Sequence, residues 1–294
     1  AFCLALKLAK EKDADIVLAT DPDADRLSVY VKDAKTGEYH SLTGNMSGCL
    51  LAEYTISQIK EKHGLPEDGA LIKTIVTTNL ADAIAKSYGI RLIECLTGFK
   101  YIGQQILGFE QSGKGTYLFG FEESYGCLIG THARDKDAVV ASMLVCEMAA
   151  YYKKQGKSLA EVIDGLYEEF GYYLNQTYSF EFDGAAGMQK MSDIMTAVRD
   201  NTPKSIAGYD VVKVSDYFLR KETDVATGSV TDIDLPKSNV IALHLADDNA
   251  VIIRPSGTEP KIKLYITSVG KDKDNAAEIC EKLVVASKEI LGVE

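Results

Sequence analysis

At the start of the chain, the spacing of apolar and polar positions predicts a helix that leads directly into a strand. Apolar residues recur at helical spacing between Phe2 and Leu8, and strands are predicted at 15–20 and 27–32. A helix that feeds a strand is the second half of a β-α-β unit. We therefore expect residues 1–41 to be the C-terminal remnant of an α/β domain, and the chain to be the C-terminal part of a longer protein.

Between residues 42 and 170, predicted strands and helices alternate. Asn79 precedes an apolar helical pattern, where an asparagine is a favourable N-cap. The predicted strands span 71–78, 90–96 and 116–122, and the helices span 46–64, 80–89, a segment beginning at 98, and 138–156. This alternation predicts a parallel or mixed sheet with helices on both faces, that is, a complete three-layer α/β/α domain.

The pattern changes again in residues 171–294. Strand-like alternation, paired strands and two amphipathic helices follow one another there, which is typical of an α+β domain. The predicted strands span 175–182, 209–218, 261–270 and two segments on either side of the turn D-D-N within 239–257, and the helices span 185–200 and about 275–291. The fold class is therefore α/β, with a separate C-terminal α+β domain.

Composition and charge narrow the range of partners. Of 294 residues, 46% are hydrophobic and 26% are charged, which is ordinary for a globular protein. The net charge of −11 argues against nucleic acid or an anionic membrane as partner. An anionic small molecule remains a suitable partner if basic groups are concentrated locally. Because the sequence contains no run of about 18 apolar residues, no membrane span is predicted.

The cysteines indicate a reducing compartment. Six cysteines are scattered without a C-x-x-C pair, and five of them lie in apolar or helical surroundings. Reduced, buried thiols are typical of cytoplasmic proteins, and no signal peptide is visible. We expect a cytoplasmic enzyme or binding protein.

Three aspartates at alternate positions, Asp21, Asp23 and Asp25, stand between the two N-terminal strands in "IVLATDPDADRLSVYV". Carboxylates that converge in this way repel one another unless a cation neutralises them, and oxygen ligands favour Mg²⁺ or Ca²⁺. An EF-hand would need glycine and glutamate where Arg26 and Lys32 stand. Mg²⁺ completed by phosphate oxygens would indicate phosphoryl chemistry. A solvated acidic turn is the alternative.

A second polar segment, "GFEESYG", follows directly on an apolar strand. Ligands bind at the carboxyl ends of strands in open α/β sheets, and Glu122 and Ser124 carry groups that bind sugar hydroxyls. The alternative is a polar helix N-cap.

The third segment is "RPSGTEPKIKLY". Its cations, hydroxyls and backbone amides surround a glycine turn, a combination that holds phosphate groups. The candidate residues are Arg254, Ser256, Gly257, Thr258 and Lys261. A tight β-turn enforced by proline and glycine is the alternative.

A fourth group is basic and consists of Lys100 in "TGFKYIG" with His132, Arg134 and Lys136 in "GTHARDKDA". These side chains would supply the local positive field that an acidic protein needs around a phosphosugar. The second segment precedes a long helix whose N-terminus also attracts anions. Each residue would equally suit a solvated surface position.

Taken in order, D-P-D-A-D-R, T-G-F-K, G-F-E-E-S-Y-G, H-x-R-x-K-D and R-P-S-G-T-E-P resemble the motifs of the α-D-phosphohexomutases, specifically bacterial phosphoglucomutases and phosphomannomutases. The resemblance spans essentially the whole chain. That family has four domains. The resemblance implies that 1–41 ends domain 2, that 42–170 is domain 3, and that 171–294 is domain 4, with a TATA-binding-protein-like α+β fold.

The resemblance also implies roles for particular residues. It assigns Mg²⁺ binding to Asp21, Asp23 and Asp25, with Arg26 as the active-site arginine beside them. It assigns hexose and phosphate binding to Glu122, Ser124, Arg134, Arg254, Ser256, Gly257, Thr258 and Lys261. Charge stabilisation and proton transfer fall to Lys100, His132 and Lys136, among which acid and base stay unassigned.

The reaction implied is the interconversion of hexose 1-phosphate and hexose 6-phosphate, of glucose or mannose, through a glucose 1,6-bisphosphate-type intermediate and a phosphoserine. The family carries that serine in a T-A-S-H-N-P-like loop, which this sequence lacks. We therefore expect the chain to need its own N-terminal domains, to be inactive alone, and to hold Mg²⁺ weakly or not at all.

Two other functions remain open at this point. One is a phosphatase that uses an aspartate of the D-x-D-x-D segment as nucleophile. The E-E-S and R-P-S-G segments further along the chain argue against this function. The other is a non-catalytic module that binds a sugar phosphate.

Overall fold

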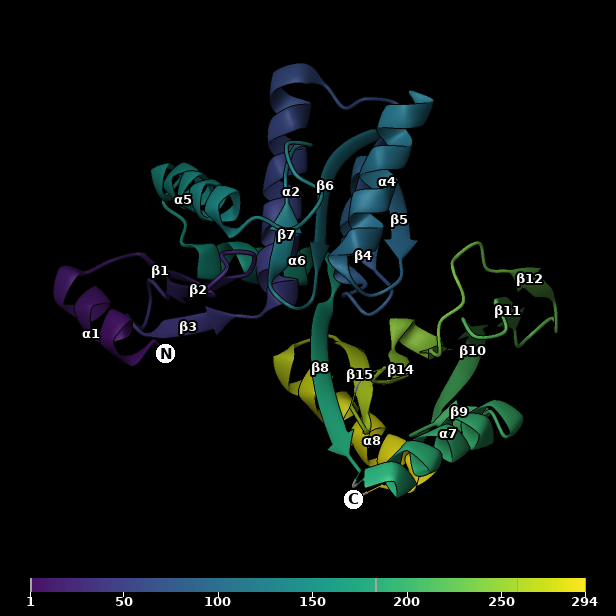
Figure 1. Cartoon of the computed structure of the whole chain (residues 1–294). Helices are drawn as coiled ribbons and strands as arrows, with labels where there is room; N and C mark the ends of the chain where they lie inside the picture. The colour runs from purple at the N-terminus through teal and green to yellow at the C-terminus, as the bar shows by residue number, and fades with distance from the viewer. Residues whose placement is uncertain (1, 183, 258, 294) are drawn as a thin grey trace. The chain divides into compact units, whose positions relative to one another are not determined.

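The protein is described by a computed structural model, which covers residues 2–182, 184–257 and 259–293 (Figure 1). The chain divides into two compact units, Ala1–Phe170 and Gly171–Glu294. The first unit contains the aspartate segment, and the second contains the R-P-S-G segment.

The first unit begins with a helix and a small antiparallel sheet. The helix α1 (Cys3–Lys12) leads into the strands β1 (Ile16–Thr20), β2 (Leu27–Lys32) and β3 (Tyr39–Leu42), paired in the order β1-β2-β3. Alternate residues of β2 are buried, as a strand with one face on a core requires. The predicted helix and the two predicted strands on either side of the aspartates are confirmed.

The rest of this unit contains a four-stranded sheet and its helices. Along the chain these are α2 (Gly44–His63), β4 (Gly69–Thr74), α3 (Leu80–Tyr88), β5 (Arg91–Cys95), α4 (Phe99–Ser112), β6 (Thr116–Glu122), β7 (Gly126–Leu128), α5 (Ala138–Lys154) and α6 (Leu159–Phe170). The sheet order is β5-β4-β6-β7, parallel except for the antiparallel pair β6-β7. The predicted mixed sheet is therefore confirmed.

Helices cover both faces of this sheet, because successive residues of β6 contact different helices. A Cβ on Gly48 of α2 would collide with the Phe121 ring, whereas a Cβ on Gly120 would lie 2.8 Å from Ile102 Cγ2 of α4. Neighbouring side chains of a strand point to opposite faces. The three-layer α/β/α architecture follows.

Several features of this unit differ from the prediction. The strands β3 and β7 were not among those predicted, and β4 and α6 differ as well. The strand predicted at 71–78 ends at Thr74, and a turn follows it. In addition, α6 lies outside the predicted helices. Its start has a capping box: the Glu161 carboxylate accepts from the Ser158 N–H (2.9 Å), and the Ser158 hydroxyl accepts from the Glu161 N–H (3.3 Å). The S-x-x-E signal was therefore present in the sequence.

The second unit is an antiparallel sheet with two long helices. Its elements are β8 (Tyr172–Glu181), α7 (Gly184–Asp200), β9 (Ser205–Ile206), β10 (Tyr209–Asp216), β11 (Lys221–Asp224), β12 (Val230–Asp232), β13 (Ile241–Leu245), the 3₁₀ turn η1 (Ala246–Asp248), β14 (Ala250–Pro255), β15 (Lys261–Gly270) and α8 (Lys273–Leu291). The strand order is β12-β11-β10-β13-β14-β15-β8, with β9 paired to β10.

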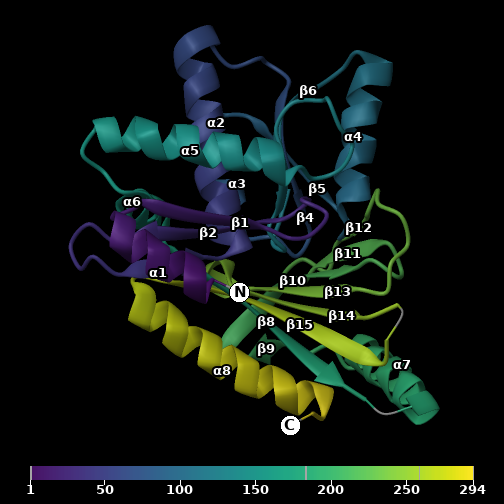
Figure 2. The same ribbon diagram turned by 60° about the vertical axis from the view of Figure 1, so that its left-hand side comes forward.

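Both helices of this unit contribute to one core. Met195 of α7 and Leu283 of α8 are buried in the same cluster as Leu243, Ile253 and Leu264 of the central strands. Figure 2 shows α7 and α8 beside this sheet. Helices packed together against an antiparallel sheet define an α+β unit, as predicted.

The thiols agree with the prediction in part. All six cysteines, each among the described residues, are free; four are buried, whereas Cys3 and Cys146 are exposed. Fewer thiols are buried than we predicted, because these two lie on the outward sides of α1 and α5. Across the described part of the chain, no helix is both long and apolar enough to cross a membrane.

Candidate active site

The aspartate loop, residues 21–26, joins β1 to β2. Asp21 Oδ1 accepts from the N–H groups of Asp25 and Arg26, each at 3.1 Å, and Arg26 Nε donates to Asp21 Oδ2 at 2.6 Å. Ala24 adopts a left-handed conformation (φ 55°) that closes the turn. One carboxylate oxygen of each of Asp21, Asp23 and Asp25 lies within 4.8 Å of the others. The predicted convergence of the three carboxylates is confirmed.

These carboxylates suit a hard divalent cation. Hydrogen bonding from the Arg26 backbone and side chain lowers the pKa of Asp21 to about 2, so this carboxylate is ionised at neutral pH. Three converging carboxylates offer the oxygen ligands that Mg²⁺ prefers. The donor set therefore fits Mg²⁺.

The E-E-S turn, residues 122–125, connects β6 to β7. In the antiparallel pair, Gly120 faces Leu128 and Glu122 faces Gly126. The turn is thus a β-hairpin, and the alternative interpretation as a helix N-cap is wrong. The carbonyl of Tyr125 accepts from the Leu27 N–H at 3.1 Å. This bond joins the turn to the residue that directly follows the aspartate loop.

The side chain of Glu122 is buried beside Lys136. Only 6% of its surface is exposed. A Cβ on Gly126 would collide with Lys136 Cδ and lie 3.1 Å from Glu122 Oε1, so the lysine and the glutamate side chains both pack against this glycine. Burial raises the pKa of Glu122, and the charge of Glu123 adds to the increase; the Ser124 hydroxyl and Lys136 oppose it without outweighing it.

The basic loop, residues 131–137, contacts the aspartate loop through one side chain. Lys136 Nζ lies 2.6 Å from Asp25 Oδ2 and 3.2 Å from Asp135 Oδ1. Burial acts against the charged form of Lys136, but its hydrogen bonds to Asp25 and Asp135 raise its pKa overall. The Ala138 N–H also donates to the Ala24 carbonyl (3.0 Å). The two loops are therefore joined by backbone as well as by charge.

The other basic residues have different partners. His132 Nε2 lies 3.0 Å from Asp137 Oδ2, and Arg134 Nη1 donates to the Thr131 carbonyl at 2.7 Å while its other amino group pairs with Glu110. The His132 and Thr131 contacts lie within the basic loop, whereas the pair with Glu110 joins the loop to α4.

Lys100 lies on the first turn of α4 and takes no part in the contacts just described between the basic loop and the aspartate loop. It is exposed, and its ammonium group lies 4.9 Å from the centre of the Tyr101 ring. One turn further along α4, a Cβ on Gly103 would collide with the Arg134 carbonyl. The N-terminal part of α4 therefore lies beside the basic loop.

The R-P-S-G turn, residues 254–261, belongs to the second unit and joins β14 to β15. The Ser256 N–H donates to the Lys261 carbonyl (2.8 Å), which closes the hairpin. Arg254 Nη1 lies 3.5 Å from the Tyr265 hydroxyl, Lys261 pairs with Glu259, and Gly257 stands in the turn. Thr258 lies outside the described residues. The described residues of this segment form the ends of a β-hairpin, and phosphate binding by the segment stays a prediction.

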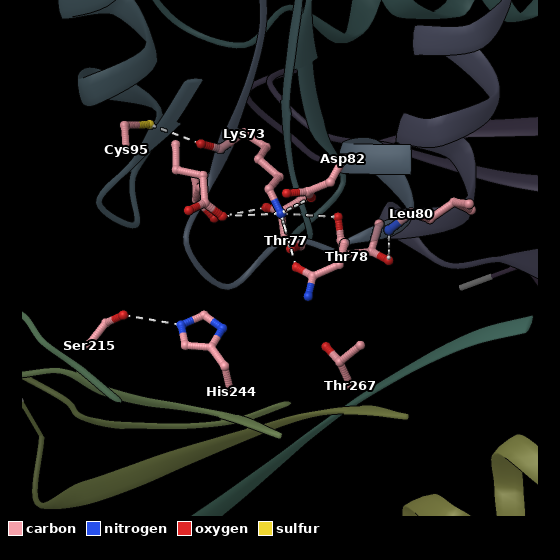
Figure 3. A network of polar contacts seen from close by, with 12 residues as sticks. Lys73, Thr77, Thr78, Leu80, Asp82, Cys95, Ser215, His244 and Thr267 are labelled. Atoms are coloured by element: carbon pink, nitrogen blue, oxygen red, sulfur yellow. Dashed lines mark hydrogen bonds and ion pairs between the residues drawn. The ribbon is translucent and has the colours of Figure 1, made fainter. Parts of the chain in front are cut away.

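Three residues that make structural contacts around these segments were not predicted from the sequence. Asp137 caps α5 by accepting from the N–H groups of Val139 (2.8 Å) and Val140 (3.1 Å), and an aspartate before an apolar helix was a usable signal. The other two are Glu123 and Lys73. Lys73 is completely buried within a polar network around the end of β4 (Figure 3). A lysine inside an apolar strand pattern offers no local sign of its partners.

Comparison with known proteins agrees with this arrangement. Residues 43–170 match the family model "Phosphoglucomutase/phosphomannomutase, alpha/beta/alpha domain III", and residues 220–285 match the model of the C-terminal domain of the same family. Together the two matches cover more than half of the chain. The chain belongs to the phosphoglucomutase/phosphomannomutase family of α-D-phosphohexomutases.

Relatives within the family extend the match beyond these two domains. The phosphoglucomutase of Staphylococcus epidermidis is 39% identical over 269 residues, which is 91% of this chain and 47% of the relative. The chain thus spans about half the length of the curated phosphoglucomutases it matches.

Solved structures of phosphohexomutases share the fold. The open form of parafusin, a phosphoglucomutase from Paramecium, aligns with a TM-score of 0.69 at 21% identity, covering 99% of this chain and 49% of that one. The N-acetylphosphoglucosamine mutase of Aspergillus fumigatus, in complex with GlcNAc-6P and magnesium, aligns with a TM-score of 0.51 at 13% identity, covering 96% and 56%. A variant of that enzyme binds glucose 1,6-bisphosphate. These likenesses bear on the fold alone.

Proposed function

We propose that this chain is the metal-, hexose- and phosphate-binding portion of a phosphohexomutase that interconverts hexose 1-phosphate and hexose 6-phosphate. One observation carries the proposal: three segments that are distant in sequence lie together in the first unit. Lys136 of the basic loop pairs with Asp25 of the aspartate loop, and the Leu27 N–H, directly after that loop, donates to the Tyr125 carbonyl of the E-E-S turn. Carboxylates, hydroxyl acceptors and ammonium groups are the chemistry that a metal-bound phosphosugar requires.

The metal proposed for the aspartate loop is Mg²⁺, held by Asp21, Asp23 and Asp25. When bound, it neutralises charge on a transferring phosphoryl group. The oxygens of the three carboxylates lie close enough to share one ion, and a structural neighbour from Aspergillus fumigatus has magnesium in its complex. Arg26 and Lys136 hold Asp21 and Asp25 in place.

The remaining residues divide between the sugar and the phosphates. We assign sugar hydroxyls to Glu122 and Ser124, and stabilisation of phosphoryl charge or proton transfer to Arg26, Lys100, His132 and Lys136, with Arg134 as a substrate contact. For the non-reacting phosphate we propose Arg254, Ser256, Gly257, Thr258 and Lys261 of the second unit. The domain assignment that accompanies this proposal is 1–41, 42–170 and 171–294.

The phosphoryl donor in this proposal comes from outside these 294 residues. A phosphoserine would transfer its phosphoryl group to the free hydroxyl of the hexose phosphate, forming a 1,6-bisphosphate, and the serine would then take back the other phosphoryl group. Relatives at 39% identity are about twice as long as this chain, which leaves room for N-terminal domains that would supply the serine.

The test separates binding from turnover. We expect the chain to bind glucose 6-phosphate weakly by calorimetry, and to produce no glucose 6-phosphate from glucose 1-phosphate in a coupled assay containing the bisphosphate. Addition of an N-terminal fragment of the longer protein should restore turnover. Turnover by the chain alone would contradict the proposal that the phosphoserine lies outside these residues. Absence of any phosphosugar binding would contradict the proposed binding site.

A further inference from the structure

The two adjacent glutamates of the E-E-S turn have different surroundings. Glu122 lies beside Gly126 and Lys136. The carboxylate of Glu123 instead accepts from the hydroxyls of two threonines, Thr74 Oγ1 at 3.3 Å and Thr77 Oγ1 at 3.5 Å. Glu123 therefore links the turn to the end of the neighbouring strand β4.

These two threonines are themselves fixed. Thr74 and Thr77 are almost fully buried, and their hydroxyl oxygens lie 2.8 Å apart. The Thr77 carbonyl accepts from Lys73 Nζ at 3.4 Å, and the N–H of Thr78 donates to Asn45 Oδ1 at 3.1 Å. The segment that binds Glu123 is thus held from both sides.

The buried ammonium group of Lys73 lies in the middle of the polar groups of this segment (Figure 3). Its ammonium group forms ion pairs with Asp82 (2.5 Å) and Glu94 (3.2 Å) and donates to Asn79 Oδ1 (3.1 Å). Burial opposes ionisation, but Glu94 and Asp82 raise the pKa of Lys73 overall, so the group stays charged. A paired buried charge holds its neighbours in one arrangement because any displacement leaves it unpaired.

The turn needs such an anchor because its own backbone is unfavourable. Tyr125 has φ 70°, a conformation that costs energy for a residue with a Cβ, and its side chain is 36% exposed. The turn also packs so tightly on α2 that a Cβ on Gly44 would lie 2.6 Å from the Tyr125 N and collide with the Glu123 carbonyl.

We propose that Glu123 is a positioning residue, whose carboxylate, bound by Thr74 and Thr77, keeps the turn in the conformation that presents Glu122 and Ser124 to the hexose. The identity of the ligand rests on the proposed function. The anchoring itself rests only on the contacts of the first unit.

The test removes both hydroxyls with little change in volume. In the double variant Thr74→Val/Thr77→Val, we expect amide hydrogen exchange in residues 122–126 to accelerate at least tenfold, while exchange in α2 and in the second unit stays unchanged. The dissociation constant for glucose 6-phosphate, measured by calorimetry, should rise by a similar factor. The matched variant Thr74→Ser/Thr77→Ser keeps both hydroxyls and should restore slow exchange.

The outcomes separate anchoring from ligand identity. Unchanged exchange in the valine variant, or equally fast exchange in the serine variant, would overturn the proposal. Should the valine variant fail to fold, Glu123→Ala removes the same contact from the other side and must produce the same local acceleration. If the unsubstituted chain binds no glucose 6-phosphate, the proposed function fails, while the exchange comparison still decides whether Glu123 anchors the turn.

Discussion

Lys136 Nζ lies 2.6 Å from Asp25 Oδ2, so the basic loop directly neutralises one of the three converging aspartates. Both side chains are half-buried, with 16% and 25% of their surfaces exposed. An ion pair in such surroundings is screened less than a surface pair. Lys136 and a divalent cation would therefore compete for the same carboxylate.

This competition predicts the effect of removing the charge. In Lys136→Met, the Mg²⁺ affinity of the aspartate loop should increase about fivefold, equivalent to about 1 kcal/mol, the upper end for a partly exposed pair. Isothermal titration with MgCl₂ measures the change. Lys100→Met removes an exposed lysine of α4 and should leave the affinity unchanged. Equal or weaker Mg²⁺ binding in Lys136→Met would contradict the competition.

Two glycines of α4 provide a matched test of the packing beside the basic loop. A Cβ on Gly103 would collide with the Arg134 carbonyl. A Cβ on Gly108 would have no described atom within 4 Å. Gly103→Ala should destabilise the first unit by about 1–3 kcal/mol. Gly108→Ala should stabilise it by about 0.5–1 kcal/mol, because alanine restricts the unfolded chain. Urea unfolding measures both, and equal effects would argue against the contact.

Asp137 should contribute to the free energy of unfolding at neutral pH and lose that contribution in acid. The hydrogen bond to His132, followed by the amides of Val140 and Val139, lowers the pKa of this cap. A lowered carboxyl pKa contributes stability above the unfolded value of 3.8 that is lost as pH falls through the folded value. Asp137→Ala should therefore cost about 1 kcal/mol at pH 7.

Urea unfolding at pH 7, 5 and 3 tests this dependence. The difference between Asp137→Ala and the unsubstituted chain should shrink between pH 5 and pH 3. Asp137→Asn keeps a capping oxygen without a charge, so it should retain most of the stability at pH 7. A constant difference at all three pH values would show that the carboxylate charge does not matter.

Glu122 should behave in the opposite sense. Burial and the neighbouring charge of Glu123 raise its pKa, so the folded state binds this proton more tightly than the unfolded state does. The contribution of Glu122 to stability therefore falls as pH rises from 4.5 through its folded pKa. The loss amounts to about 1.4 kcal/mol for every tenfold difference in proton affinity between the folded and unfolded states.

The substitution that tests this is Glu122→Gln. It should raise the free energy of unfolding at pH 8, leave it unchanged near pH 4, and abolish binding of glucose 6-phosphate. Glu67→Gln, at an exposed position, should change neither property. A loss of stability in Glu122→Gln at pH 8 would mean that the carboxylate is needed for the fold.

Most of the elements were predictable because they depend on near neighbours in the chain. The alternation in β2 and the apolar spacing in α5 each identify an element without any long-range information. The end of β4 was not predictable in this way. Ile75 and Val76 continue an apolar, β-branched run, yet the chain turns there, where the buried Lys73 binds the carbonyls of Thr77 and Thr78.

The sequence by itself determined which chemical groups the protein has and in what order: three aspartates after a strand, two glutamates and a serine after another, and a run of basic residues before a helix. Only the tertiary structure decided which of them meet. Lys100 and Lys136 were both candidates from the sequence, and folding placed one over Tyr101 and brought the other to Asp25. Local pattern encodes secondary structure, whereas the pairing of charges depends on packing between segments far apart in the chain.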